Sequence, residues 1–406
     1  MKRYLVLLVI CISLLLSACS EDNTNRIPSN QFSGSSSDEN SLLEKTVVYT
    51  PSQPLTMEET IEQFFEQQYN AYADLQYIDI SYLLDMNQVR LRNSLIWLET
   101  LIQRRSLIEE HQLAFVETAK YPYKITYDNE PRDQRMEFWT RRGLINEDEV
   151  IVHFTITGEK GQAYPPLMAV NSQHTMRLNE IDGVWKITFH YFPGATRRFH
   201  QNNSLILPSE EEMLADLMEE FRASPDNSSA RTPLQSNTST YDGVRAAQYA
   251  KKYSESRNPA FYDIEDWLGN CANFISQSLL AGLGTGELTD IQRENMTSQW
   301  YAGEGGGSPA WENVEYFWEY ATESQGIQDQ GLHGEVVETI SELELGGIVQ
   351  VRTGKTGRND ENFNHSLILV DSSTLLLAQN SPDCFVYYSD LVNVDARFFN
   401  PRGLNK

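Results

Sequence analysis

The sequence predicts an α+β protein built from two folded domains. Its 406 residues exceed the usual length of one domain, and 40% of them are hydrophobic, which is enough to fill two cores. In each half of the chain, segments whose apolar residues recur at helical spacing come before β-rich segments. Helices followed by a run of strands are typical of the α+β class.

The N-terminus has the parts of an export signal. Two basic residues open it, and residues 4–16 form an uncharged apolar run that is too short to span a bilayer as a helix. Small residues then precede Cys19, and this segment resembles the lipobox of bacterial lipoproteins. The resemblance implies a signal peptide over residues 1–18 and a lipid on Cys19 that anchors the chain to the extracytoplasmic face of the cell membrane. An ordinary signal peptide cleaved nearby is the alternative.

The composition restricts the partners of the chain. The net charge of −25 opposes binding to nucleic acid, whose backbone is also negative. No spacing of His, Cys, Asp and Glu matches a metal site and no cofactor motif is present, so we expect neither a metal nor a cofactor. Residues 19–54 are polar and rich in Ser, Asn and Asp, which predicts a disordered tether.

Residues 55–200 are predicted to form the first domain. Thr56 followed by Glu59 is a capping box, so a helix should begin here. A second helix is expected around Trp97, and a strand with alternating residues follows at 150–157. The face of the first helix that should pack on the core consists of Ile61, Phe64, Phe65, Tyr69 and Tyr72.

A hairpin closes the first domain. Two alternating segments flank Asp182-Gly183, a dipeptide that favours a two-residue hairpin turn. The order of helices and strands, and above all this hairpin, resembles the cone-shaped NTF2-like domains. That resemblance implies a pocket on the concave face of the sheet, which His153 and His190 would line. Histidines on strands are more often hydrogen-bonded structural residues, and we favour that role for both.

Residues 201–240 are expected to connect the domains as a short acidic helix capped by Ser209 and a polar linker. The second domain then covers residues 241–406. A helix is predicted to open it at 244–253, and another to begin at Cys271. The three β-rich runs that follow are LELGGIVQV, NHSLILV and TLLLAQNS.

Cys271, His365 and Asn380 are the candidate catalytic residues. A thiol nucleophile needs a base that takes its proton and a group that orients the base. Cys271 sits where a helix should begin, and a helix N-terminus favours the thiolate. His365 opens a β-rich run, and the side chain of Asn380, after the next run, is expected to accept a hydrogen bond from the imidazole. Gln379 and Asp383 are alternatives for this orienting role.

The second domain resembles a family of amidase domains that is related to the NlpC/P60 and CHAP cysteine peptidases. The segments that carry the resemblance include YDGVRAAQYAKKY, NCANFISQSLLAG, SPAWENVEYFWEY, LGGIVQV and NHSLILV. The resemblance implies a papain-like fold, a nucleophilic role for Cys271 and a base role for His365. Three positions depart from the family pattern: Asn270 and Gly347 stand where the family usually has Asp, and Asn380 where it usually has His.

These features predict a membrane-anchored cysteine amidase or peptidase, with peptidoglycan stem peptides as the leading substrate. The first domain would then serve as a positioning or recognition module, or would bind a small ligand. A catalytically silent, papain-like binding module of a surface lipoprotein is the alternative. A disulfide between Cys271 and Cys384, which would abolish activity, is also open.

Overall fold

The structure is a computed structural model of the chain. Residues from 45 onward form one compact unit. The predicted signal peptide, Cys19 and most of the predicted tether lie outside the described residues. The described residues are 46–132, 137, 149–192, 205–222, 238–264, 269–290, 292–303, 305–322, 331–353, 362–380, 382–392 and 394–405.

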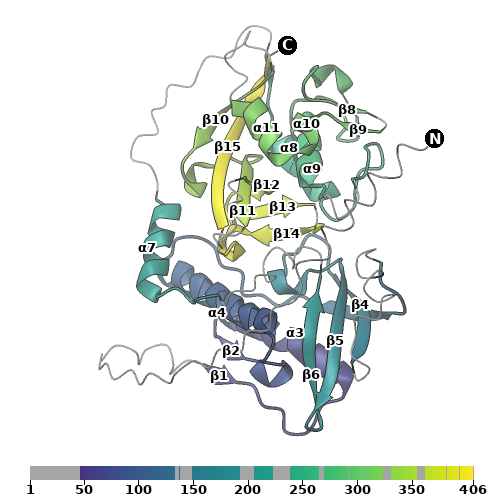
Figure 1. Cartoon of the computed structure of the whole chain (residues 1–406). Coiled ribbons are helices and arrows are strands. Elements are labelled where there is room, and N and C mark those ends of the chain that lie inside the picture. The colour runs from purple at the N-terminus through teal and green to yellow at the C-terminus, as the bar shows by residue number, and fades with distance from the viewer. Residues whose placement is uncertain are drawn as a thin grey trace, which may run out of the picture. The chain divides into compact units, whose positions relative to one another are not determined.

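The α+β class predicted from the sequence is confirmed, because helices pack beside separate β-sheets in the described chain (Figure 1). The NTF2-like and papain-like assignments stay predictions. Within the described residues, no helix combines the length and the apolarity that crossing a membrane requires.

Two long helices, α3 (Met57–Asp74) and α4 (Val89–Glu110), dominate the first half of the described chain. The capping box of α3 is confirmed: the Thr56 hydroxyl accepts from the backbone N–H of Glu59, and the Glu59 carboxylate accepts from the backbone N–H of Thr56. All five core residues predicted for α3 are buried. The sequence pattern therefore located both the start of this helix and its inner face.

A four-stranded antiparallel sheet lies beside these helices. Its order is β3 (Tyr123–Asp128), β4 (Val150–Gly158), β5 (Gln173–Ile181) and β6 (Val184–Tyr191). The predicted hairpin is β5–β6, and both turn residues, Asp182 and Gly183, have positive φ angles of 53° and 77°. Asp and Gly adopt this backbone conformation at low cost, which is why the dipeptide fixes the turn.

Strand β1 (Val47–Val48) lies inside the segment predicted to be a tether. It pairs in parallel with β2 (Ile78–Asp79), and the backbone N–H of Tyr49 donates to the carbonyl of Asp79 at 2.9 Å. The side chain of Tyr49 packs against the core of the first half. Ordered structure therefore begins before residue 55, because Val47 and Val48, which are both β-branched, pair with the open edge of β2.

The strand histidines of the first half are hydrogen-bonded, and His153 and His174 are buried whereas His190 is half-buried. His153 Nδ1 lies 2.9 Å from the Thr175 hydroxyl oxygen, and His190 Nε2 lies 2.9 Å from Nδ1 of His174, whose ring is stacked against it. Burial lowers the pKa of His174 to about 4, and burial followed by the proximity of His174 lowers the pKa of His190 well below its usual value. Both rings are therefore neutral in the folded protein.

This neutral pair should make the folded state sensitive to acid. The unfolded chain protonates these imidazoles near pH 6.5, whereas the folded chain resists protonation, so stability is complete above pH 6.5 and is lost as the pH falls towards 4. The shift of His174 alone corresponds to about 3 kcal/mol at pH 4. Urea unfolding at pH 7 and pH 4 should show a smaller loss for a His174→Phe/His190→Phe double variant than for a His111→Gln surface control. Equal losses in both variants would contradict the assignment.

A seven-stranded antiparallel sheet forms the second half, in the order β10-β15-β11-β12-β13-β14 with β7 also beside β15. The three predicted β-rich runs correspond to β11 (Ile348–Thr353), β12 (His365–Asp371) and β13 (Leu376–Gln379). The central strand β15 was not predicted, because Pro401 and Gly403 interrupt its pattern. The remaining strands of this sheet are β7 (Thr238–Thr240), β10 (Gly331–Val337), β14 (Cys384–Tyr387) and β15 (Val394–Asn405).

Helices α8 (Gly243–Tyr253) and α9 (Cys271–Gly282) pack over β12 and β13. Residues on β12 alternate between two cores: Ile368 belongs to the core beneath these helices, and Leu367 to the core on the other face. The other elements are α7 (Glu210–Glu220), α10 (Pro309–Glu312), α11 (Val314–Thr322), β8 (Ala302–Gly303), β9 (Gly306–Gly307), and the short 3₁₀ turns Ser81–Leu83, Pro166–Met168, Arg293–Asn295, Ile340–Glu342 and Tyr388–Asp390.

Asp390 joins the second half to both long helices of the first. Its Oδ1 lies 2.5 Å from the Arg105 guanidinium on α4, and its Oδ2 accepts from the Tyr72 hydroxyl on α3 at 2.7 Å. The side chains of Arg105 and Asp390 are both 0% exposed, and the guanidinium carbon lies 3.5 Å from the centre of the Tyr72 ring. Burial, together with the charge of Asp390, raises the pKa of Tyr72 well above its usual value, so the hydroxyl stays a donor.

Candidate active site

Cys271 is the first residue of α9, as the sequence predicts. Gly269 precedes the helix with a φ of 84°, a left-handed conformation that glycine adopts without strain, and it turns the chain sharply into the helix. Cys271 is not in a disulfide and is buried, with 7% of the residue exposed. A buried thiol at a helix N-terminus lies near backbone N–H groups and the positive end of the helix dipole, both of which favour a thiolate.

His365 is the first residue of β12, and its partner is Gln379 on the adjacent strand β13. The imidazole Nε2 lies 2.6 Å from the side-chain carbonyl Oε1 of Gln379. Because a carbonyl oxygen can only accept, Nε2 carries the proton and Nδ1 is left with the lone pair. This tautomer gives the ring one nitrogen for orientation and one for taking a proton.

The start of β12 and the first turn of α9 lie in one region of the second half. Helix α9 packs on β12, and Cys271 belongs to a small cluster with Ala272, Val314 and Phe363. Phe363 precedes His365 by only two residues. The fold therefore brings together the segments of Cys271 and His365, which lie far apart in the sequence, as the resemblance implies.

Asn380 has a different partner from the one expected. Its side-chain oxygen accepts from Nδ2 of Asn270 at 2.9 Å, and its own Nδ2 donates to the carbonyl of Ser254 at 2.7 Å. Gln379, which the sequence offered as an alternative, occupies the place beside His365. Gln379 is the last residue of β13 and Asn380 lies just after it, where its side chain is held by Asn270 and Ser254. The hydrogen bond to the imidazole that was expected from Asn380 is therefore made by Gln379.

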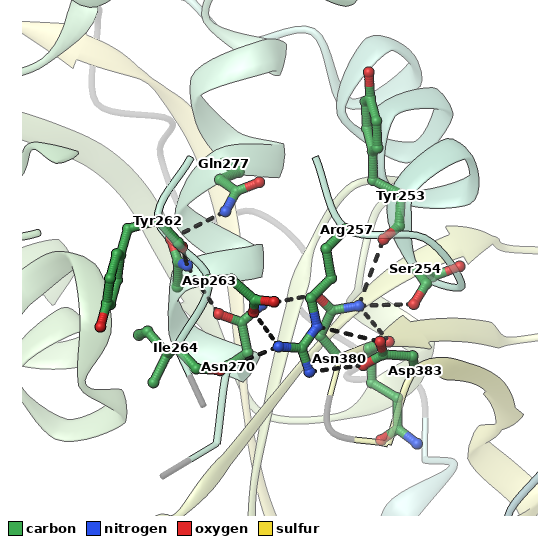
Figure 2. A network of polar contacts seen from close by, with 12 residues as sticks. Tyr253, Ser254, Arg257, Tyr262, Asp263, Ile264, Asn270, Gln277, Asn380 and Asp383 are labelled. Carbon is green, nitrogen blue, oxygen red and sulfur yellow. Dashed lines mark hydrogen bonds and ion pairs between the residues drawn. The ribbon is translucent and has the colours of Figure 1, made fainter. Parts of the chain in front are cut away.

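Asp383, the other alternative for the orienting role, pairs with Arg257. The guanidinium Nε lies 3.2 Å from Oδ2 of Asp383, and the same guanidinium also binds Asp263 and donates to the carbonyl of Ile264 at 3.1 Å (Figure 2). Burial on its own would lower the pKa of Arg257, but the charges and hydrogen bonds of Asp383 and Asp263 raise it above its usual value. This cation therefore holds the loop before Cys271 against the loop after β13.

A chain of buried amides, which the sequence reasoning missed, leads to Cys271. Asn270, Asn273 and Gln277 lie along one side of α9, and each is hydrogen-bonded to the next: Asn273 Nδ2 donates to Asn270 Oδ1 at 2.8 Å, and Gln277 Nε2 donates to Asn273 Oδ1 at 3.0 Å (Figure 2). The chain continues through the Tyr249 hydroxyl, which donates to Gln277 at 2.8 Å and accepts from Asn258 at 2.9 Å. The available signal was the i, i+3, i+7 spacing of amides in an otherwise apolar helix.

No disulfide joins Cys271 and Cys384 in the structure. Cys384 begins β14, and its Sγ accepts from Nε2 of Gln379 at 3.1 Å. Gln379 thus contacts His365 through its oxygen and Cys384 through its nitrogen. Among the described residues, no group of three or more His, Cys, Asp or Glu side chains is placed to hold a metal ion.

Comparisons with known proteins found a relative and a family model. The chain is 32% identical over 130 residues to "Uncharacterized protein YhbB" of Bacillus subtilis (strain 168), and this match spans 32% of the chain and 37% of that relative. The chain therefore covers little more than a third of the relative's length. No solved structure matches the chain significantly. Residues 240–398 match the family model described as "Putative amidase domain", and this match supports an amidase domain that contains Cys271, His365 and Gln379.

Proposed function

We propose that the protein is a cysteine amidase or peptidase with Cys271 as its nucleophile. The proposal rests on the arrangement of a thiol and an imidazole. The buried thiol of Cys271 lies at the start of α9. The imidazole of His365 lies on the adjacent strand β12, and its Nε2 donates a hydrogen bond to Gln379. These are the three groups that thiol catalysis needs, namely a thiolate, a base and an orienting group. The match of residues 240–398 to an amidase-domain model supports the same class of reaction.

In the proposed mechanism, Nδ1 of His365 takes the proton from Sγ of Cys271. The thiolate forms a bond to the amide carbon, and the electron pair of the carbonyl moves onto its oxygen. Backbone N–H groups in the first turn of α9 stabilise that oxyanion. When the C–N bond breaks, the imidazolium gives its proton to the leaving amine. The acyl group is now held on Sγ as a thioester. Water, deprotonated by His365, attacks the thioester carbon, the C–S bond breaks to release the acid, and the imidazolium returns the proton to Sγ.

Gln379 has the orienting role in this mechanism. It cannot titrate, but its carbonyl fixes the ring plane and the tautomer of His365, and it stabilises the imidazolium by accepting a hydrogen bond. Its amide nitrogen is itself held by Sγ of Cys384, so the carbonyl end faces the ring. The experiment that tests the function is to compare amide hydrolysis by the unaltered protein with that by a Cys271→Ala variant.

Peptidoglycan stem peptides are the substrate class that we propose. The support is the predicted export of the chain together with the resemblance of its second half to cysteine peptidases of the cell wall. An exported amidase meets the peptide bridges of the wall before other amides. Assays should therefore include muropeptide digests as well as simple amides.

We also propose that the mature chain is anchored to the membrane by lipid on Cys19. The support is the apolar run followed by small residues and a cysteine. A radiolabelled or alkyne-tagged fatty acid should be incorporated into the unaltered protein and not into a Cys19→Ala variant. Label that persists in the variant, or its absence from both proteins, would refute the anchor.

A further inference from the structure

Asn270 stands immediately before the nucleophile, and its side chain does not cap the helix that Cys271 begins. An asparagine at this position normally accepts a hydrogen bond from the first turn of the helix. Here the side chain has other partners: Nδ2 donates to Asn380 at 2.9 Å, and Oδ1 accepts from Asn273 at 2.8 Å. Asn270 and Asn380 are 2% and 1% exposed, so both amides are buried.

Asn380 connects three elements at one point. It follows the last residue of β13, its Oδ1 binds the start of α9, and its Nδ2 donates to the carbonyl of Ser254 at the end of α8. Figure 2 shows Asn380 between Asn270 on one side and the backbone of Tyr253 and Ser254 on the other. A buried amide whose partners lie on three elements resists displacement of any one of them, because each lost bond would leave a buried polar group unpaired.

Asn273 fixes the same turn of α9 from the other side. Its Nδ2 also donates to the carbonyl of Tyr262 at 2.9 Å, and its Oδ1 accepts from the Trp311 indole at 2.7 Å. The first turn is therefore held by partners from two directions, towards Asn380 and towards Trp311. Rotation of the helix about its axis would break bonds on both sides.

The geometry points to Asn270 and Asn380 as a neutral positioning pair for the nucleophile, which holds the first turn of α9 so that Cys271 faces the substrate carbonyl. This inference rests on the proposed function. In this inference, Asn380 affects the reaction by positioning helix α9 and not by orienting His365. The family that the second half resembles usually has Asp where this chain has Asn270, and a buried carboxylate there would repel the thiolate of Cys271. We therefore expect the thiolate of this chain to form at a lower pH than it would with Asp at position 270.

The test uses the full chain and two variants of the pair. Asn380→Ala should lower kcat by about 10- to 100-fold with little change in KM, because small misplacements of a reacting group cost about this much. Asn270→Asp should move the pH midpoint of Cys271 alkylation by iodoacetamide to higher pH, which is measured without any substrate. Circular dichroism and urea unfolding confirm that each variant folds.

Asn295→Ala is the matched control. Asn295 is a buried asparagine at the other end of α9, where its Nδ2 donates to the carbonyl of Leu283 at 2.9 Å. Its loss should cost similar stability and leave kcat unchanged. The inference is overturned if Asn380→Ala keeps kcat within twofold of the unaltered protein, if Asn295→Ala lowers kcat equally, or if Asn270→Asp leaves the alkylation midpoint in place. Failure of the proposed function would give a different result: either the Cys271→Ala variant would stay active or the unaltered protein would hydrolyse no amide, and in both cases the alkylation midpoint still reports on the pair.

Discussion

Amide hydrolysis should fall by at least about a thousandfold when Cys271 is replaced by alanine, since removal of a nucleophile leaves only binding and oxyanion stabilisation. Alanine keeps the helix and adds no polar group to the buried site around Cys271. The measurement is kcat/KM of the purified protein on a panel of peptide amides and muropeptides. Activity that survives in this variant would exclude the thiol mechanism.

The second thiol of the same half gives the matched control. Cys384→Ser keeps an acceptor for Nε2 of Gln379, so we expect it to retain activity. Alkylation separates an enzyme from a silent binding module: Cys271 should react quickly at neutral pH in the unaltered protein and slowly in His365→Ala. Slow, equal alkylation in both proteins, together with no hydrolysis, would favour the binding module.

Replacing Asp390 with alanine should lower the free energy of unfolding by about 3–5 kcal/mol, the cost of leaving one member of a buried ion pair without its partner. The change leaves the guanidinium of Arg105 uncompensated in a site where both side chains are 0% exposed, and it also removes the acceptor of the Tyr72 hydroxyl. Urea unfolding at pH 7, followed by tryptophan fluorescence, measures the loss.

Asp395→Ala is the control for this prediction. Asp395 pairs with Arg352 at 2.7 Å, but both side chains are partly exposed, so its removal should cost about 1 kcal/mol or less. Because Asp390 contacts both long helices, its loss should also weaken the coupling between the two halves. A single sharp transition of unchanged midpoint in Asp390→Ala would show that the pair contributes little.

Local features of the fold were predictable because their causes lie within a few residues. The capping boxes at Thr56 and Ser209 and the turn at Asp182-Gly183 depend on side chains and backbone angles close in sequence, and all three are present. Strand β15 was not predictable, because its position in the sheet depends on pairing with β10 and β11, tens of residues away. The sequence of one strand gives little information about which strands it will pair with.

The positions of two candidate residues were predictable, because the helix that begins at Cys271 and the strand that begins at His365 follow from local pattern. The hydrogen-bond partner of His365 did not follow from local pattern. Gln379 and Asn380 are neighbours in sequence, but Gln379 contacts His365 whereas Asn380 contacts Asn270. Asn270 and Asn380, which separately depart from the family pattern, prove to be partners in one hydrogen bond.

The ion pair of Asp390 has a consequence for where the chain can be divided. The family match ends at residue 398 and begins at residue 240, so it includes Asp390 and leaves out Arg105 and Tyr72. A protein trimmed to the matched residues would keep the carboxylate of Asp390 but would lack the guanidinium of Arg105 that pairs with it. We therefore expect a protein trimmed to residues 240–398 to be less stable than the whole chain, so expression of this segment should include the first half.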